Sequence, residues 1–162
     1  MKDSRSLRSL QLAVVVGILF CAAAPLFSAL KNWAVVTSAG SKLQDVPMAD
    51  LAKLCKGTQK LWPDGKPFTL VIHGPDSADM RYAIEKLFGV EGANVKPLLA
   101  KVNETRKVVV IVDSDEELFR AVEAIPGAIG LVDVYSINSS VKVLRVDGKL
   151  PFDVGYALRG NY

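Results

Sequence analysis

Apolar and polar positions alternate along this chain in blocks whose lengths fit strands followed by helices. The clearest block is Phe68–Phe88, where the β-branched run FTLVI is followed by the break His73-Gly74-Pro75 and then by apolar residues at helical spacing. Asp76 or Ser77 can cap the helix, and Gly89 is a natural stop. The block therefore predicts a buried strand, a tight loop and an amphipathic helix. In α/β proteins such a helix start is a common place for a small ligand.

Similar blocks lie on both sides of this one. Strands are predicted at Ala34–Val36, Val108–Val112, Ala128–Val134 and Val141–Val146. Helices are predicted from Asp45 or Pro47 to about Lys56, and from a capping box of Ser114 and Glu117 through Ala124. The fully apolar run 108–112 is typical of an interior parallel strand. Residues 91–100 are predicted to be short helical or irregular, and the tail from Leu150 irregular. The alternation predicts an α/β fold, with helices on both faces of a mostly parallel sheet in three layers, α/β/α.

The first thirty residues do not fit this pattern. Lys2, Arg5 and Arg8 form a basic head, and Leu12–Leu30 carries no charge and is almost wholly apolar. This composition indicates either a cleaved secretory signal or an N-terminal membrane anchor. Both alternatives place residues 31–162, one domain of ordinary size, in the periplasm or otherwise outside the cytoplasm.

Net charge and cysteine content limit the kinds of partner and bond that this chain can have. The formal net charge of +3 owes much to the basic head, and the remaining chain is close to neutral. No basic stripe with interleaved aromatic residues is present, so we do not expect nucleic acid as a partner. Cys21 lies in the apolar segment and leaves Cys55 alone in the domain, where it is expected on the buried face of a helix.

Polar residues follow three of the predicted strands: Thr37-Ser38, His73–Ser77 and Asp113-Ser114. If these strands are parallel, their loops meet at one edge of the sheet and surround a small concavity. Ser77, Thr37, Ser38 and His73 would then line a site for a small oxyanion. The plainer interpretation is that Ser77 and Ser114 only cap helices. Four carboxylates crowd the same edge and would repel an anion at short range: Asp76, Asp79, Asp113 and Asp115.

Catalytic and metal sites find little support in this sequence. His73 is the only histidine, and its neighbours Asp76 and Asp79 match no metal-ligand spacing. A Ser-His-Asp arrangement within five positions of one turn rarely reaches catalytic geometry, and GPDSA is not a GxSxG elbow. We therefore expect no enzyme activity, no metal and no cofactor.

Several segments resemble phosphate-type periplasmic solute-binding proteins of ABC transporters. They are ADLAKLCKG, LWPDGKPFTLVIHGPDSAD, AIPGAIGLVDVYS and VLRVDGKLPFDVGYALRG. The resemblance implies one lobe of a periplasmic-binding-protein-like fold of type II, phosphate or another small oxyanion as ligand, and an ABC permease or other membrane protein as partner.

The chain departs from the family in two respects. Full members have two lobes joined by a hinge, whereas this chain matches one. The arginine, glycine and threonine of the family's phosphate loop are also replaced, because residues 74–79 read GPDSAD. An alternative function is therefore a structural or interaction module that binds no ligand and belongs to a membrane complex.

Overall fold

The computed structural model describes residues 31–90 and 94–160. The predicted signal or anchor, residues 1–30, lies outside the described residues. Within the described ranges, no helix has the length and apolar character needed to cross a membrane.

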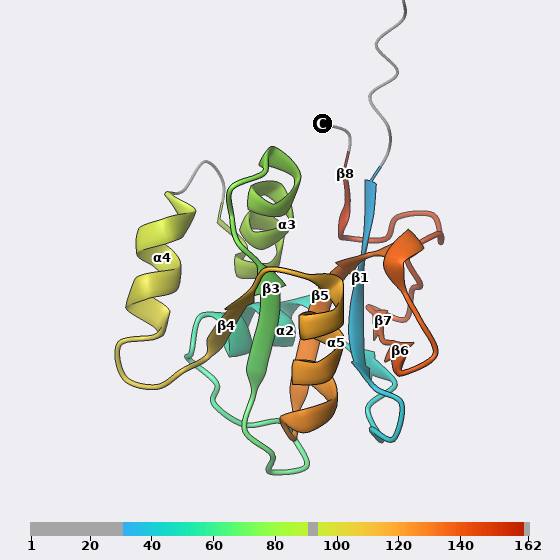
Figure 1. Cartoon of the computed structure of the whole chain (residues 1–162), viewed down its shortest axis with the longest axis horizontal. Coiled ribbons are helices and arrows are strands. Elements are labelled where there is room, and N and C mark those ends of the chain that lie inside the picture. Colours follow the sequence, from blue (N-terminus) through green and yellow to red (C-terminus); the bar gives the residue numbers. More distant parts are fainter. Residues whose placement is uncertain (1–30, 91–93, 161–162) are drawn as a thin grey trace, which may run out of the picture.

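The core of the domain is one twisted sheet with strand order β4-β3-β5-β1-β6, to which β8 adds by pairing with β1 (Figure 1). Its strands are β1 (Lys31–Ser38), β3 (Thr69–His73), β4 (Val109–Val112), β5 (Ala128–Asp133), β6 (Val141–Val143) and β8 (Arg159–Gly160). Two short strands, β2 (Asp45–Val46) and β7 (Arg145–Val146), pair with each other in parallel beside this sheet.

Strand direction corrects part of the sequence prediction. β3 pairs in parallel with β4 and β5, as expected, but β1 is antiparallel to β5, β6 and β8. The sheet is therefore mixed rather than mostly parallel. β4 is an edge strand rather than an interior one, and Ile111 is half exposed there. The tail also contributes a strand, β8. Hydrophobic patterning reports which positions are buried, but it does not report strand direction or order.

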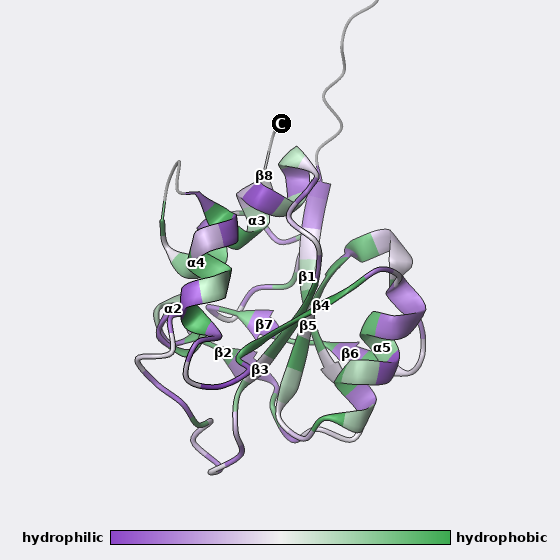
Figure 2. Ribbon diagram, turned by 60° about the vertical axis from the view of Figure 1, so that its left-hand side comes forward, coloured by the Kyte–Doolittle hydropathy of each residue, from purple (hydrophilic) through white to green (hydrophobic). Residues whose placement is uncertain are grey.

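Helices cover both faces of the sheet, so the predicted three-layer α/β/α arrangement is confirmed. α2 (Met48–Cys55), α3 (Ala78–Phe88) and α4 (Val95–Val102) lie on one face, and α5 (Asp115–Ala124) lies on the other (Figures 1 and 2). Alternate strand residues serve the two cores: Val35 and Leu70 pack towards α2 and α3, whereas Val36 and Val71 pack towards α5.

The helix ends follow the sequence signals. The N–H of Met80 donates to Ser77 Oγ, and α3 ends at Gly89 in the left-handed conformation. The N–H of Glu117 donates to Ser114 Oγ, and Glu117 Oε2 in turn accepts from the N–H of Asp113, one residue before the predicted cap. Cys55 is buried at the end of α2, and burial raises the pKa of its thiol.

Trp62 packs down at the rim of the domain. Its indole stands edge-on to Phe68, with ring centroids 5.5 Å apart, and its Nε1 donates to the carbonyl of Gly127 at 2.7 Å. Gly127 has a φ of +79°, and a Cβ at this position would stand 2.3 Å from the carbonyl oxygen of Pro67. The PGAIG segment therefore needs glycine at this position, because the chain before β3 passes directly against it.

We expect Gly127→Ala to lower the free energy of unfolding by more than about 2 kcal/mol, because it adds a backbone clash to left-handed strain of about 1–2 kcal/mol. Gly148→Ala is the matched control. Gly148 also has a positive φ, +75°, but nothing lies within 4 Å of the added Cβ. Urea unfolding followed by tryptophan fluorescence measures both variants. Equal losses in the two would contradict the close approach at Gly127.

Candidate functional site

The carboxyl edge of the sheet, where β3, β4 and β5 end, brings two of the predicted loops together. His73 ends β3 and pairs in register with Val112 of β4, so the loops that lead to α3 and α5 are neighbours. His73 Nε2 lies 2.8 Å from Asp115 Oδ1 and joins the two loops directly. Ser77 is exposed at the start of α3 on this edge.

Thr37 and Ser38 do not lie at this edge, which corrects the predicted four-residue site. Since β1 is antiparallel to β5, its end lies beside the start of β5, with Thr37 opposite Ile129. The side chain of Thr37 is buried, and its Oγ1 donates to the carbonyl of Ala128 at 3.2 Å. Thr37 therefore has a structural role at the opposite edge of the sheet.

The first turn of α3 offers donors to an anion. The N–H of Met80 is taken by the Ser77 cap, whereas the N–H groups of Ala78 and Asp79 donate to no group among the described residues. Ala78 is exposed and Asp79 is partly exposed, so this turn lies at the surface. A helix start with free N–H groups carries partial positive charge and favours anions.

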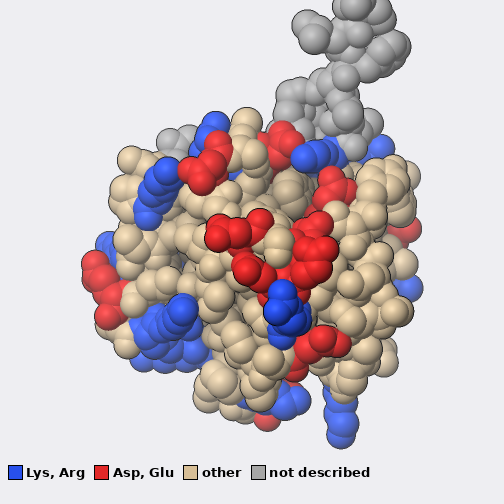
Figure 3. All heavy atoms as spheres, in the orientation of Figure 1, with Lys and Arg blue, Asp and Glu red and all other residues tan. Residues whose placement is uncertain are grey.

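Carboxylates dominate the electrostatics of this edge. Figure 3 shows them gathered in the middle of the face, over the first turn of α5, which contains Asp115, Glu116 and Glu117. Two of the predicted repelling groups are partly neutralised, because Asp79 pairs with Lys31 at 2.8 Å and Asp76 pairs with Lys96 at 2.9 Å. The edge therefore weakens anion binding but does not exclude it.

Sequence reasoning missed several residues of this edge. Lys31 and Lys96 come from β1 and α4, and nothing in the local sequence places them here. Arg81 donates from Nη1 to the carbonyl of Asp76 at 2.9 Å, and its position one helical turn after Ser77 is a signal that could have found it. Asn32, at the start of β1, is 7% exposed, and its Oδ1 has no hydrogen-bond partner among the described residues.

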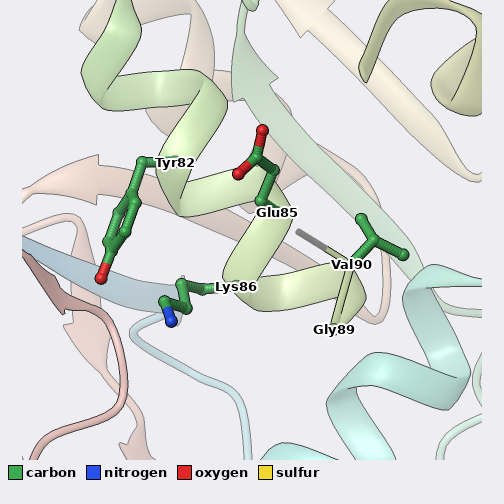
Figure 4. A pocket seen from close by; sticks show the side chains of 5 residues that line it. All are labelled: Tyr82, Glu85, Lys86, Gly89 and Val90. Atoms are coloured by element: carbon green, nitrogen blue, oxygen red, sulfur yellow. The ribbon is translucent and has the colours of Figure 1, made fainter. Parts of the chain in front are cut away.

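Two cavities lie near α3, and neither is lined by Ser77 or His73. One, of about 390 Å³, lies between the β3–α3 loop and α4 and is lined by Pro75, Asp76, Lys96 and Leu99, among others. The other, of about 510 Å³, lies at the far end of α3 (Figure 4). There the ammonium of Lys86 stands 5.3 Å from the ring centroid of Tyr82. The described residues contain no group of histidine, cysteine or carboxylate side chains that could hold a metal ion.

Exposed apolar side chains form a patch at the carboxyl edge. Tyr135 and Phe152, together with Val154 two residues further along the chain, are named here the aromatic patch. They are 84%, 60% and 89% exposed, and the rings of Tyr135 and Phe152 lie 6.2 Å apart. Tyr135 belongs to a short 3-10 turn, η1 (Val134–Ser136), that directly follows β5 and contacts β1. Contiguous exposed apolar surface is a common feature of protein interaction sites.

Comparison with known proteins finds similarity to phosphate-binding proteins. The chain is 35% identical over 79 residues to the phosphate-binding protein PstS 2 of Streptococcus agalactiae, a match that covers 49% of this chain and 26% of that protein. No family model matches the chain. The match thus spans about a quarter of the length of the curated relative.

Solved structures give the same result over more of the chain. An ABC-type phosphate transport receptor from Vibrio cholerae superposes with a TM-score of 0.61 at 18% identity, covering 81% of this chain and 54% of the receptor. PstS from Borrelia burgdorferi superposes with a TM-score of 0.58 at 18% identity, covering 82% of this chain and 56% of that protein. The superposed region is therefore about half of each of those proteins. The resemblance drawn from the sequence is confirmed as a similarity: part of the chain is similar in sequence to a phosphate-binding protein, and its fold is that of one lobe of a periplasmic binding protein.

Proposed function

We propose that this chain is an extracytoplasmic solute-binding lobe that holds a small oxyanion such as phosphate at the exposed first turn of α3. The observation that supports the proposal is the pair of free N–H groups, of Ala78 and Asp79, at the carboxyl edge. The relatives are described as phosphate-binding proteins, which makes phosphate the first ligand to test.

The charges around the turn set the expected strength. A helix start contributes about 0.3–1 kcal/mol to the binding of an exposed anion. One carboxylate at about 4 Å costs a similar amount, about 1 kcal/mol in water. Because Lys31 and Lys96 partly neutralise Asp79 and Asp76, the balance is slightly favourable. We therefore expect weak binding, with a Kd well above 1 mM, because a Kd of 1 mM would need about 4 kcal/mol.

The proposed partners follow from the relatives and the N-terminal sequence. An ABC permease or another membrane protein is the proposed partner, and the apolar run Leu12–Leu30 is the proposed route out of the cytoplasm. His73 borders the site through its bond with Asp115 and is proposed to position the two loops. Ser77, which caps α3, is proposed to face the ligand with its exposed side.

Replacing Ala78 by proline tests the free donors. Proline at the first helical position removes one N–H without disturbing the helix, and the extended φ and ψ of Ser77, −83° and 149°, suit a residue before proline. We expect Ala78→Pro to weaken phosphate binding severalfold while the melting temperature is unchanged. Amide NMR shifts during a phosphate titration measure the binding.

Ala78→Gly is the control, because it shortens the same side chain and keeps the N–H. It should bind phosphate as the unchanged chain does. Phosphate-induced shifts that avoid the first turn of α3, or that survive unchanged in Ala78→Pro, would contradict this site.

The aromatic patch supports a second candidate function, an interaction module. The aromatic patch lies at the carboxyl edge, where the start of β1 pairs with β8. The chain superposes on only about half of each solved relative. We propose that a second copy of the chain covers this edge, because the exposed rings of Tyr135 and Phe152 offer an apolar surface that self-association would bury.

Phe152→Ser combined with Val154→Ser tests this function. Both side chains are exposed, so their loss should change the free energy of unfolding by less than about 0.5 kcal/mol. We expect the double variant to stay monomeric at concentrations where the unchanged chain associates, as measured by sedimentation equilibrium. Leu61→Ser, at a half-exposed leucine outside the patch, is the control and should associate normally. A chain that stays monomeric before any substitution would rule out self-association through the patch.

A further inference from the structure

A basic pocket lies at the amino ends of β3 and β4, at the opposite edge of the sheet from the first turn of α3. Its volume is about 300 Å³, and four cationic side chains line it: Lys56, Lys60, Lys101 and Arg106. Lys56 follows α2, Lys101 lies in the last turn of α4, and Arg106 lies in the loop that leads to β4. Apolar side chains, including Leu98 and Val108, form the rest of the wall.

No negative charge in the lining offsets these cations. The described lining contains no carboxylate, and none of the four cations forms an ion pair within the described part of the chain. Figure 3 shows Lys and Arg side chains gathered at the lower end of α4, away from the carboxylates over α5. Positive charges beside apolar walls focus the electrostatic field and raise the local concentration of anions.

Arg106 provides an independent observation at the same place. Its Nη1 donates to the carbonyl of Phe68 at 3.1 Å, which fixes the guanidinium against the start of β3. Its Nη2 is buried and has no hydrogen-bond partner among the described residues. A buried cationic donor without an acceptor is costly, and a small turn of the guanidinium towards the pocket would let an oxygen of a bound anion satisfy it.

Helix termini explain only part of this cluster. Lysines at the ends of α2 and α4 stabilise the partial negative charge of those helix ends, which accounts for Lys56 and Lys101. That role does not account for Lys60, which lies beyond the helix, or for the orphaned Nη2 of Arg106.

We propose that the basic pocket binds a phosphate-bearing anion. Such a group can come from a soluble molecule or from an anionic lipid headgroup, and the recognising chemistry is the same: a fixed guanidinium with lysines around it. The pocket shares no residue with the first turn of α3, so this proposal and the proposed function can be tested independently.

The test uses the full chain with two probes, inorganic pyrophosphate in solution and vesicles of phosphatidylcholine with or without phosphatidylglycerol. We expect Lys60→Gln combined with Lys101→Gln to weaken binding about threefold to tenfold, as expected for two exposed lysines. Both lysines are exposed, so the fold should be retained. Calorimetry measures pyrophosphate binding, and co-sedimentation measures vesicle binding.

Lys42→Gln combined with Lys53→Gln is the matched control, since it removes the same charge from exposed positions outside the pocket. If the pocket variant loses binding to pyrophosphate but not to phosphatidylglycerol vesicles, the ligand is a soluble molecule. If it loses binding to the vesicles but not to pyrophosphate, the ligand is a lipid headgroup. The proposal is overturned if the control loses as much binding as the pocket variant, or if neither probe binds. It is also overturned if Ala78→Pro, rather than the lysine changes, removes pyrophosphate binding.

Discussion

The parallel pairing of β3 with both β4 and β5 is the constraint on which the rest of the domain depends. It brings the ends of three strands to one edge, and it makes the loops before α3 and α5 neighbours. The bond between His73 and Asp115 is possible only because of this pairing. The same pairing puts the starts of β3 and β4 side by side, where Arg106 reaches the carbonyl of Phe68. Both proposed anion sites are therefore products of one strand arrangement.

The two edges of the sheet differ in charge, although the domain is close to neutral. Carboxylates at the start of α5 suit that helix, because the first turn favours negative charge, and lysines at the ends of α2 and α4 suit those helices for the opposite reason. Local helix stabilisation thus accounts for much of the segregation. The orphaned donor of Arg106 is not explained in this way, and the two open N–H groups of α3 are those that any helix start offers; they lie on opposite edges and support the two proposals.

Local signals predicted the helix ends, and nonlocal geometry set the limits of prediction. Ser77, Ser114 and Gly89 act within one turn of their own position, so the sequence identified their roles correctly. Thr37 was assigned to the wrong edge, because β1 reads as an apolar strand whichever way it runs. The run 108–112 was predicted to be an interior strand but forms an edge strand, because a buried strand and an edge strand beside a helix can have the same composition. Arg106, Lys31 and Lys96 act across the fold, and no spacing in the sequence connects them to their partners.

The proposed oxyanion site and the aromatic patch are physically coupled. Lys31 links them, since it pairs with Asp79 in the first turn of α3 while β1 contacts η1, which holds Tyr135. A protein surface seated on the patch would exclude water from this edge. Each N–H donor of α3 would then act in a medium of lower dielectric constant, where its attraction for an anion is stronger. The unpaired carboxylates would repel that anion more strongly for the same reason. The covering surface must therefore bring positive charge of its own if it is to convert weak binding into tight binding.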